Sequence, residues 1–260
     1  MNILDKIVLN KRAEVASAKK DTSIKELESS VLFDRTTYSF KEFLTAPDRT
    51  GIIAEFKRRS PSKGIINDQA GVEAVTTAYA AAGASALSVL TDKDFFMGTK
   101  TDLYKARQVN QIPILRKDFM IDEFQVIEAK SLGADIILLI AAILTPKEIN
   151  TLAKLAKSLG LNVLLEVHNL EELERSIHPD LDAIGINNRN LADFSVSVET
   201  SYKLAEHIPP GFMKISESAI SDPDTIKGLK KAGFNGFLIG ENFMKQADPG
   251  AAMAEFVKAL

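Results

Sequence analysis

The sequence contains no cysteine and no tryptophan, and only three of its 260 residues are histidine. Without cysteine the chain forms neither disulfides nor thiolate nucleophiles, which suits a reducing compartment, so we predict a cytoplasmic protein. The histidines His168, His178 and His207 do not pair at the spacing of metal ligands. His168 directly follows a predicted strand, a position more typical of a packed, hydrogen-bonded residue than of a ligand. We therefore predict no metal site and, because no cofactor fingerprint is present, no cofactor.

Strong charge of one sign and long apolar runs are also missing. The formal net charge is -3, which argues against the basic character of a nucleic-acid-binding protein. The longest apolar run, residues 136–144, has nine residues, whereas a membrane-spanning helix needs about 20. The first residues lack the basic segment and the apolar stretch of a signal peptide. We predict a soluble protein that has neither a nucleic-acid partner nor a membrane partner.

Short apolar segments, in contrast, are abundant, and their pattern predicts a sheet. Hydrophobic residues make up 45% of the chain, which is enough for one large core. Most of the apolar runs are continuous rather than alternating, as in parallel strands that are covered on both faces. The eight predicted strands are residues 52–54, 86–90, 112–115, 136–140, 163–165, 183–186, 212–215 and 237–239.

Segments with helical spacing of apolar residues lie between those strands. Residues 72–82, 123–132, 146–159 and 224–232 each end directly before a glycine, which can take the left-handed conformation that closes a helix. Strands begin every ~20 to 35 residues, about the length of a βα unit. This alternation predicts an α/β fold, a closed (βα)8 TIM barrel. A doubly wound open sheet is the alternative, but its Gly-x-Gly-x-x-Gly turn is absent.

No linker rich in Ser, Gly or Pro divides the chain, so we predict a single domain over residues 1–260. Within it, residues 1–50 form a helical N-terminal extension and residues 51–260 form the barrel. The extension begins with an apolar helix face made by Ile3, Leu4, Ile7 and Val8. For residues 1–32 we favour a plug over the bottom of the barrel, with a lid at its top as the alternative. For residues 39–44 both positions stay open.

Charged and polar residues stand where most of the predicted strands end. Because active sites of this fold lie at the carboxyl ends of the strands, these side chains would meet in one mouth. Charges placed so close together are costly unless a polar, anionic ligand fills the space. The residues are Glu55 and Lys57 after the first strand, Lys117 after the third, Glu166 at the fifth, Asn187 and Arg189 after the sixth, Glu217 and Ser218 after the seventh, and Gly240 and Glu241 after the eighth.

The ends of the last two strands indicate what the ligand carries. In many barrels the loops there bind a phosphate through backbone N–H groups. Ser218 and Gly240 occupy these positions, and a glycine lets the backbone approach an anion closely. Ser60 lies on the first loop, next to them once the barrel closes. These residues predict a phosphorylated small molecule as the ligand.

Several stretches at the strand ends also carry a family resemblance. They are Ile-Ala-Glu-Phe-Lys at 53–57, Ser-Pro-Ser-Lys-Gly at 60–64, Leu-Thr-Asp at 90–92, Phe-Phe-Met-Gly at 95–98, Leu-Arg-Lys-Asp-Phe at 115–119, Leu-Glu-Val-His at 165–168, Gly-Ile-Asn-Asn-Arg-Asn-Leu at 185–191, Ser-Glu-Ser at 216–218 and Leu-Ile-Gly at 238–240. In this order they resemble the indole-3-glycerol-phosphate synthase family, the ring-closing enzymes of tryptophan biosynthesis. The resemblance covers nearly the whole chain.

The resemblance implies a decarboxylating carbon–carbon lyase. Such an enzyme cyclises 1-(2-carboxyphenylamino)-1-deoxyribulose 5-phosphate to indole-3-glycerol phosphate, with loss of carbon dioxide and water. It implies that Lys117 is the general acid that protonates the ketose carbonyl and that Glu166 is the general base of the later dehydration. The other implied catalytic residues are Glu55 and Asn187, which hold the sugar hydroxyls and shuttle protons, and Lys57, which together with Arg189 binds the anthranilate carboxylate and steadies the anionic end of the substrate. The implied substrate-binding residues are Arg189; Ser60, Ser218 and Gly240 at the phosphate; Phe96, Phe119 and Leu191 around the aromatic ring; and Glu217, Ala219 and Glu241.

Three expectations concern the chemistry of this site. Burial and the nearby cation Lys57 should lower the pKa of Lys117 toward a value that suits an acid. The family usually has glycine at the position of Ala219; an alanine still offers its backbone N–H, so we expect phosphate binding to survive with Ala219 at a negative φ. The family often has Ser or Thr at the position of Glu241, and this carboxylate should turn outward because it would repel a phosphate.

Two other functions compete with the synthase. Phosphoribosylanthranilate isomerase is another phosphate-binding barrel. Its catalytic residues are usually a Cys and an Asp, and this chain has no Cys. A barrel that binds phosphorylated metabolites as a non-catalytic sensor is the second alternative, and the pairing of Lys117 with Glu166 argues against it. Other enzymes of tryptophan biosynthesis are the candidate protein partners.

Overall fold

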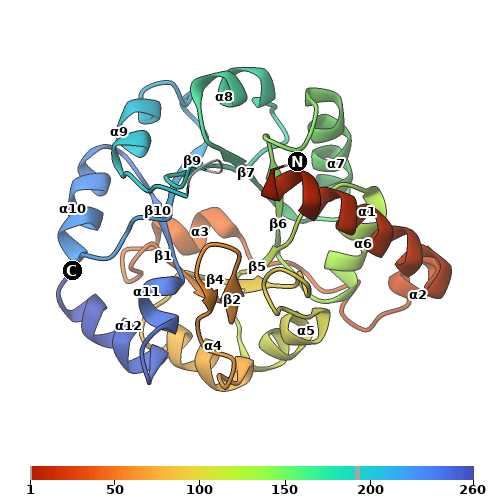
Figure 1. Cartoon of the computed structure of the whole chain (residues 1–260), viewed down its shortest axis with the longest axis horizontal. Helices are drawn as coiled ribbons and strands as arrows, with labels where there is room; N and C mark the ends of the chain where they lie inside the picture. Colours follow the sequence, from red (N-terminus) through yellow and green to blue (C-terminus); the bar gives the residue numbers. More distant parts are fainter. Residues whose placement is uncertain (1, 191–193) are drawn as a thin grey trace.

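The continuous apolar segments form the strands of a closed barrel in a computed structural model that describes residues 2–190 and 194–260 (Figure 1). All eight strands run parallel, and each pairs with its neighbours in chain order until β1 closes the ring against the last strand. This architecture confirms the predicted (βα)8 barrel. The barrel strands are β1 (Ile52–Phe56), β4 (Ala86–Leu90), β5 (Ile114–Lys117), β6 (Ile136–Ile140), β7 (Asn162–Val167), β8 (Ala183–Asn187), β9 (Met213–Glu217) and β10 (Gly236–Ile239).

Helices follow the strands and surround the barrel, as Figure 1 shows. They are α4 (Val72–Ala81), α5 (Lys100–Val109), α6 (Glu123–Ser131), α7 (Pro146–Ser158), α8 (Leu170–Ser176), α9 (Glu199–Ala205), α10 (Pro223–Lys231), α11 (Glu241–Met244) and α12 (Pro249–Lys258). The glycines after α4, α6, α7 and α10 have φ angles between 74° and 95°, so they close these helices in the predicted way. Within the two described ranges, no helix is both long and apolar enough to cross a membrane.

The apolar residues form two main layers that explain why the strand runs are continuous. Alternate strand residues such as Ile53, Leu115 and Leu164 fill the inside of the barrel. Their neighbours, such as Ile52 and Val163, pack outward against the helices. Because side chains alternate along a strand, a strand between two apolar layers needs apolar residues at every position.

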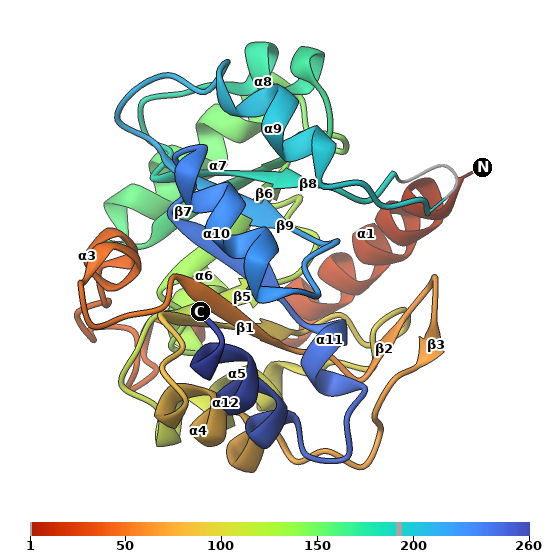
Figure 2. The same cartoon turned by 90° about the vertical axis from the view of Figure 1, so that its left-hand side faces the viewer.

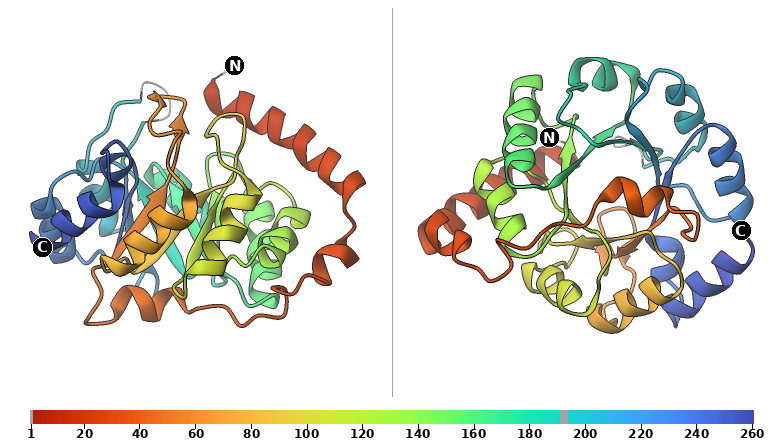
Figure 3. Two further views of the ribbon diagram at one scale, coloured as in Figure 1. Left: turned by 90° about the horizontal axis from the view of Figure 1, so that it is seen from below. Right: turned by 180° about the vertical axis from the view of Figure 1, so that it is seen from behind.

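The N-terminal extension divides between the two ends of the barrel, which corrects our preferred prediction for residues 1–32. It comprises α1 (Ile3–Asp21), α2 (Ile24–Glu28) and α3 (Phe40–Thr45). Figures 2 and 3 place α1 and α3 on opposite sides of the barrel. The apolar face at the start of α1 lines the cavity at the carboxyl ends of the strands, so α1 is the lid rather than the plug. Phe40 and Leu44 of α3 instead pack into the inner core with residues such as Ala86 and Met213, which begin their strands.

A short hairpin stands beside the mouth of the barrel. After β1 the chain forms β2 (Arg59–Ser60) and β3 (Gly64–Ile65), which pair antiparallel. The hairpin projects from the same side as the start of α1 (Figure 2). The loop that follows β1 therefore forms one side of the opening of the barrel.

Candidate active site

A cavity of about 700 Å³ lies at the carboxyl ends of the strands. Its walls come from strand ends on several sides of the barrel, from the hairpin, from α11 and from the start of α1. The described residues predicted for the site all line it: Glu55, Lys57, Ser60, Phe96, Lys117, Phe119, Glu166, Asn187, Arg189, Glu217, Ser218, Ala219, Gly240 and Glu241. Leu191, also predicted to shape the aromatic pocket, lies outside the described residues. Closure of the barrel thus joins residues spread over more than 180 positions of sequence.

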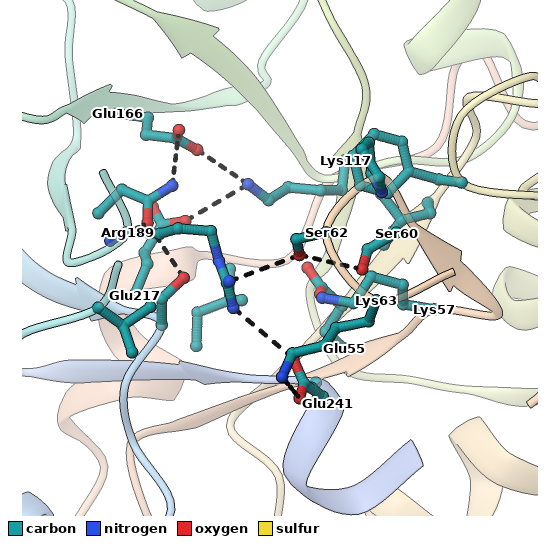
Figure 4. A pocket seen from close by; sticks show the side chains of 18 of the residues that line it. Glu55, Lys57, Ser60, Ser62, Lys63, Lys117, Glu166, Arg189, Glu217 and Glu241 are labelled. Carbon is teal, nitrogen blue, oxygen red and sulfur yellow. Dashed lines mark hydrogen bonds and ion pairs between the residues drawn. The ribbon is translucent and has the colours of Figure 1, made fainter. Parts of the chain in front are cut away.

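The centre of the site is the amine of Lys117 between two carboxylates (Figure 4). Lys117 Nζ lies 2.9 Å from Glu166 Oε2 and 3.4 Å from Glu217 Oε2. Lys117 ends β5, Glu166 lies near the end of β7 and Glu217 ends β9, so all three face inward at the same height. Both glutamates are almost fully buried, at 4% and 1% exposure. One cation therefore lies between two carboxyl groups that water does not solvate.

These carboxylates reverse the pKa shift that we expected for Lys117. Burial alone would lower the pKa of the amine, but Glu166, Glu217 and Glu55 outweigh burial and raise it. Lys57 does not act in the expected way, because its amine lies 2.7 Å from Glu55 Oε1 and is paired there. The expectation of a lowered pKa was wrong because it counted the neighbouring cation but not the three anions around it.

The two glutamates differ in their protonation. Burial raises the pKa of both carboxyls, but Lys117, His168 and Asn187 more than offset this for Glu166, whose pKa is lowered. For Glu217, burial and repulsion by Glu166 and Glu55 prevail over Lys117 and raise the pKa to about 7. Since two close carboxylates do not both ionise freely, Glu166 carries the charge and Glu217 holds a proton near neutrality. The site thus contains an ionised base beside a carboxyl group that gains and loses its proton near neutral pH.

Two glycines make room for these acidic side chains. A Cβ at Gly185 of β8 would overlap Glu217 Oε1, and a Cβ at Gly240 would lie 2.6 Å from Glu55 Oε1. Ser88 of β4 donates a hydrogen bond of 3.3 Å to the other oxygen of Glu55. Glycine is therefore needed at these two positions, because any side chain there would occupy the space of a buried carboxylate.

Asn187 connects the catalytic carboxylate to the neighbouring loop. Its Nδ2 donates to Glu166 Oε1 at 3.0 Å. Its Oδ1 accepts from the Ser218 hydroxyl at 3.0 Å and from the Arg189 backbone N–H at 3.1 Å. The amide of Asn187 is therefore held in one orientation, with its donor side toward Glu166.

The opposite wall of the cavity carries cations that cluster around Glu241 (Figure 4). Glu241 Oε1 lies 3.5 Å from Lys63 Nζ, and Glu241 Oε2 lies 3.6 Å from Arg189 Nη2. Arg189 Nη1 also lies 3.5 Å from the Ser62 hydroxyl. The expectation that Glu241 turns outward is therefore wrong: its carboxylate lines the cavity and faces the two cations.

The turn after β9 also departs from expectation. Ser218 and Ala219 have φ angles of 65° and 59°, so Ala219 does not keep the negative φ that we expected. A left-handed conformation costs about 1–2 kcal/mol for a residue with a Cβ. The surrounding contacts hold the turn in place, since Asn188 Nδ2 lies 3.3 Å from the Ser218 carbonyl oxygen and donates to it.

Replacing Ala219 with glycine is expected to stabilise the fold by about 0.5–1 kcal/mol, because the relief of backbone strain exceeds the extra entropy of the unfolded chain. Urea unfolding measures the change. The matched control is Ala13→Gly on the exposed side of α1, which should lose up to about 1 kcal/mol as an ordinary helical position does. Equal losses in both variants would show that the turn at Ala219 is not strained.

Aromatic side chains complete one wall. The rings of Phe96 and Phe119 lie 5.9 Å apart between centroids, tilted by 40°. Both line the cavity together with Ile3, Leu4 and Ile7 of α1. The cavity therefore combines an apolar, partly aromatic surface with charged groups, so it suits a ligand with an aromatic part and an anionic part.

Some lining residues differ from those predicted from the sequence. Ser62, Lys63 and Asn242 line the cavity but were not selected, although the Ser-Pro-Ser-Lys-Gly stretch contains two of them. Ile3, Leu4 and Ile7 were recognised as an apolar face but assigned to the bottom of the barrel. The available signal was Lys11, which stands at helical spacing between Ile7 and Val15 on the stripe that α1 buries, because a charge on an apolar face needs partners that the strand ends supply.

The fold and the site together define a class of protein: a (βα)8-barrel enzyme with an acid–base pair and a group of cations in one cavity at the carboxyl ends of its strands. Comparison with known proteins narrows the class. A sequence model of indole-3-glycerol phosphate synthase matches residues 4–256. The chain belongs to the indole-3-glycerol phosphate synthase family.

Individual relatives agree with this assignment. An indole-3-glycerol phosphate synthase of Bacteroides thetaiotaomicron is 50% identical over 259 residues, covering 100% of this chain and 99% of the relative. One of Laribacter hongkongensis is 44% identical, covering 97% of this chain and 98% of the relative. Among solved structures, 3-hexulose-6-phosphate synthase of Salmonella typhimurium matches with a TM-score of 0.64 at 11% identity, covering 81% of this chain and 98% of that one. This last likeness concerns the fold alone.

Proposed function

We propose that the chain closes the indole ring of 1-(2-carboxyphenylamino)-1-deoxyribulose 5-phosphate and releases indole-3-glycerol phosphate, carbon dioxide and water, with the residues of the cavity in the roles below. The observation that carries the proposal is the amine of Lys117 within 3.4 Å of two buried carboxylates at the base of one cavity. Ring closure needs a proton donor and dehydration needs a base, and this arrangement supplies both in one place.

Lys117 is the general acid of ring closure in this proposal. As the aromatic carbon attacks the ketose carbonyl, negative charge develops on the carbonyl oxygen, and the ammonium group gives it a proton. The raised pKa of Lys117 keeps the amine charged until that oxygen has become strongly basic. The neighbouring carboxylates therefore make Lys117 a weak acid that is fully protonated at neutral pH. Its positive charge also stabilises the developing negative charge on the substrate.

Glu166 is the base of the dehydration. After carbon dioxide leaves, the former carbonyl oxygen departs as water, and a proton is removed from the adjacent methylene carbon. Glu166 is ionised at neutral pH because Lys117 and His168 offset its burial, so it can accept that proton. Glu217, whose pKa is raised to about 7, binds a substrate hydroxyl as either donor or acceptor.

The remaining residues position the substrate. Lys57 binds the anthranilate carboxylate, while Glu55 and Asn187 bind the sugar hydroxyls. Phe96 and Phe119 enclose the aromatic ring, and their apolar surface reduces solvation of the carboxylate, which favours its loss as carbon dioxide. Anchoring the distant phosphate holds the flexible ketose in a reactive pose. The phosphate ligands in this proposal are Ser60, Ser218, Ala219 and Gly240, with Arg189 and Glu241 at the rim.

Glu241 competes with the substrate phosphate for two cations in this proposal. In the ligand-free site its carboxylate faces Lys63 and Arg189, so an arriving phosphate competes with it for these two cations. The side chain moves away when the phosphate binds, because two anions cannot share one cation pair without repulsion.

The test is direct turnover. Purified protein is mixed with the carboxyphenylamino-deoxyribulose phosphate, and the appearance of indole fluorescence is followed. We expect an increase that depends on enzyme concentration. Binding of the substrate without any fluorescence from well-folded protein would favour the sensor alternative and contradict the proposal.

The family acts on a phosphorylated small molecule. Where this chain works in the cell, and which proteins it contacts, are also part of the proposed function. A cytoplasmic location and contact with other enzymes of tryptophan biosynthesis belong to the proposal, supported by the cysteine-free sequence and by the pathway of the reaction. Co-purification of the tagged chain from its own cytoplasm, followed by identification of bound proteins, tests both points.

A further inference from the structure

A cluster of buried polar side chains lies next to the turn of Ser218 and Ala219, outside the wall of the cavity. Its members are Asn188, which directly follows β8, Ser201 in α9 and Ser216 in β9. Each is at most 3% exposed, and none is among the described residues that line the cavity. Buried polar groups are costly unless they are paired, so the contacts of this cluster show what it holds in place.

The three side chains form a closed ring of hydrogen bonds. Asn188 Nδ2 donates to Ser216 Oγ at 3.0 Å. Ser201 Oγ donates to Asn188 Oδ1 at 2.9 Å, and the two serine hydroxyls lie 2.8 Å apart. Since the Ser201 proton is directed to Asn188, the Ser216 hydroxyl donates to Ser201. Each group in the ring thus donates to one neighbour and accepts from the other, and hydrogen bonds connected in this way strengthen one another.

The ring fixes the orientation of the Asn188 amide. Oδ1 accepts a second hydrogen bond, from the Ser201 backbone N–H at 3.0 Å. Nδ2 donates its second proton to the Ser218 carbonyl oxygen at 3.3 Å. The amide therefore makes all four of its hydrogen bonds. A flipped amide would place its NH2 group against the Ser201 N–H, so only the observed orientation is compatible with these neighbours.

The bond from Asn188 to Ser218 also sets the direction of a backbone N–H. The peptide between Ser218 and Ala219 is trans, and in a trans peptide the C=O and the N–H point in opposite directions. Because the Ser218 carbonyl oxygen points to Asn188, the Ala219 N–H points away from Asn188, on the side where Ala219 lines the cavity. Within residues 2–190 and 194–260, no group accepts a hydrogen bond from this N–H. It is therefore available to an anionic ligand.

We propose that Asn188 is a positioning residue for phosphate binding, which holds the peptide between Ser218 and Ala219 so that the Ala219 N–H is directed at the phosphate. The inference rests on the proposed function, because that function assigns the phosphate to this turn. It also accounts for the left-handed φ angles of 65° and 59° at Ser218 and Ala219. A strained conformation persists only where its surroundings hold it, and the bond from Asn188 opposes the rotation that would relieve it.

The test compares ligands with and without the phosphate. In Asn188→Ala the Ser218 carbonyl loses its donor, so the peptide is free to rotate. Indole-3-glycerol phosphate should then bind about tenfold more weakly, or about 1.4 kcal/mol, near the lower end of what a hydrogen bond to a charged group contributes. Indole-3-glycerol, which lacks the phosphate, should bind as it does to the wild type. The KM of the substrate should rise with kcat nearly unchanged, because the lost contact is far from the reacting atoms.

Asn110→Ala is the matched control. Asn110 is 5% exposed, and its Nδ2 donates to Thr76 Oγ1 at 3.0 Å and to the Ala106 carbonyl oxygen at 2.8 Å. Because Asn110 precedes β5, it lies at the amino ends of the strands, away from the cavity. Both variants lose buried hydrogen bonds, so urea should unfold both more easily than the wild type. Only Asn188→Ala should lose affinity for the phosphate-bearing ligand.

A second variant decides the question if Asn188→Ala does not fold, which circular dichroism reports. Ser201→Ala keeps Asn188 but opens the ring, so affinity for indole-3-glycerol phosphate should fall about threefold while that for indole-3-glycerol stays the same. Unchanged affinity for indole-3-glycerol phosphate in the folded variant, an equal fall for both ligands, or the same fall in Asn110→Ala would overturn the role of Asn188. Failure of the wild type to turn over the substrate would instead overturn the proposed function, so the two failures are distinguishable.

Discussion

Replacing Lys117 with methionine is expected to lower kcat about 10³-fold, within the range that general acid catalysis contributes. Methionine matches the length of the lysine stem but can neither donate a proton nor stabilise the developing oxyanion. The loss should appear in kcat rather than in binding, since the phosphate, carboxylate and aromatic contacts of the cavity involve other residues. Indole fluorescence measures turnover, and quenching titration with the product indole-3-glycerol phosphate measures binding.

The fold should survive this substitution. Glu166 and Glu217 lose the cation between them, which raises the pKa of both carboxyls, so that they bind protons instead of remaining as buried charges. Lys154→Met, at an exposed position of α7, is the matched control and should keep full activity. If product binding fell as far as kcat, Lys117 would be a binding residue and its assignment as the acid would be wrong.

Replacing Lys11 with methionine is expected to lower the free energy of unfolding by about 3–5 kcal/mol, the usual cost of breaking a buried ion pair. Lys11 is fully buried, and its amine lies 3.0 Å from Asp92 Oδ2 and 2.9 Å from Asp118 Oδ1. These carboxylates follow β4 and β5, so Lys11 fixes α1 to the rim of the barrel. Burial lowers the pKa of Lys11, but Asp118 and Asp92 outweigh burial and raise it, so its contribution is complete at neutral pH.

The effect of Lys11→Met should depend on pH in a defined sense. Burial raises the pKa of Asp118, but Arg116 and Lys11 outweigh burial and lower it from 3.8 to about 2. A lowered pKa contributes stability above the unfolded value, and this contribution is lost as the pH falls through the folded value. The difference in unfolding free energy between the wild type and the variant should therefore have its largest value at pH 7 and decrease below pH 3.8. Urea unfolding at a series of pH values measures it.

A lysine on the same helix provides the control for Lys11. Lys19 pairs with Asp122 at 2.6 Å, but the two side chains are 46% and 30% exposed. Exposed pairs contribute at most about 1 kcal/mol, so Lys19→Met should change the unfolding free energy little. Similar losses in the two variants would mean that the buried ions do not hold α1. Because the start of α1 lines the cavity, we also expect Lys11→Met to weaken product binding.

Much of the fold could be read from local patterns. The predicted strands at residues 86–90 and 136–140 coincide with β4 and β6, since continuous apolar runs between turn residues admit few other structures. The glycines that end the helices were predicted for the same reason, because a left-handed backbone favours a residue without Cβ. Lys117 and Glu166 could be placed in one mouth because a closed parallel barrel brings every strand end to the same side.

The sequence by itself determined the barrel and the set of strand-end side chains that meet in the cavity. Only the tertiary structure decided that α1 covers the top, that Glu241 faces the cations, that Ala219 is left-handed and that the pKa of Lys117 rises. The reason is physical. Strands and helices follow from the spacing of neighbours along the chain, whereas the side on which a helix packs, and the charge that a buried amine carries, depend on distances to residues far away in sequence.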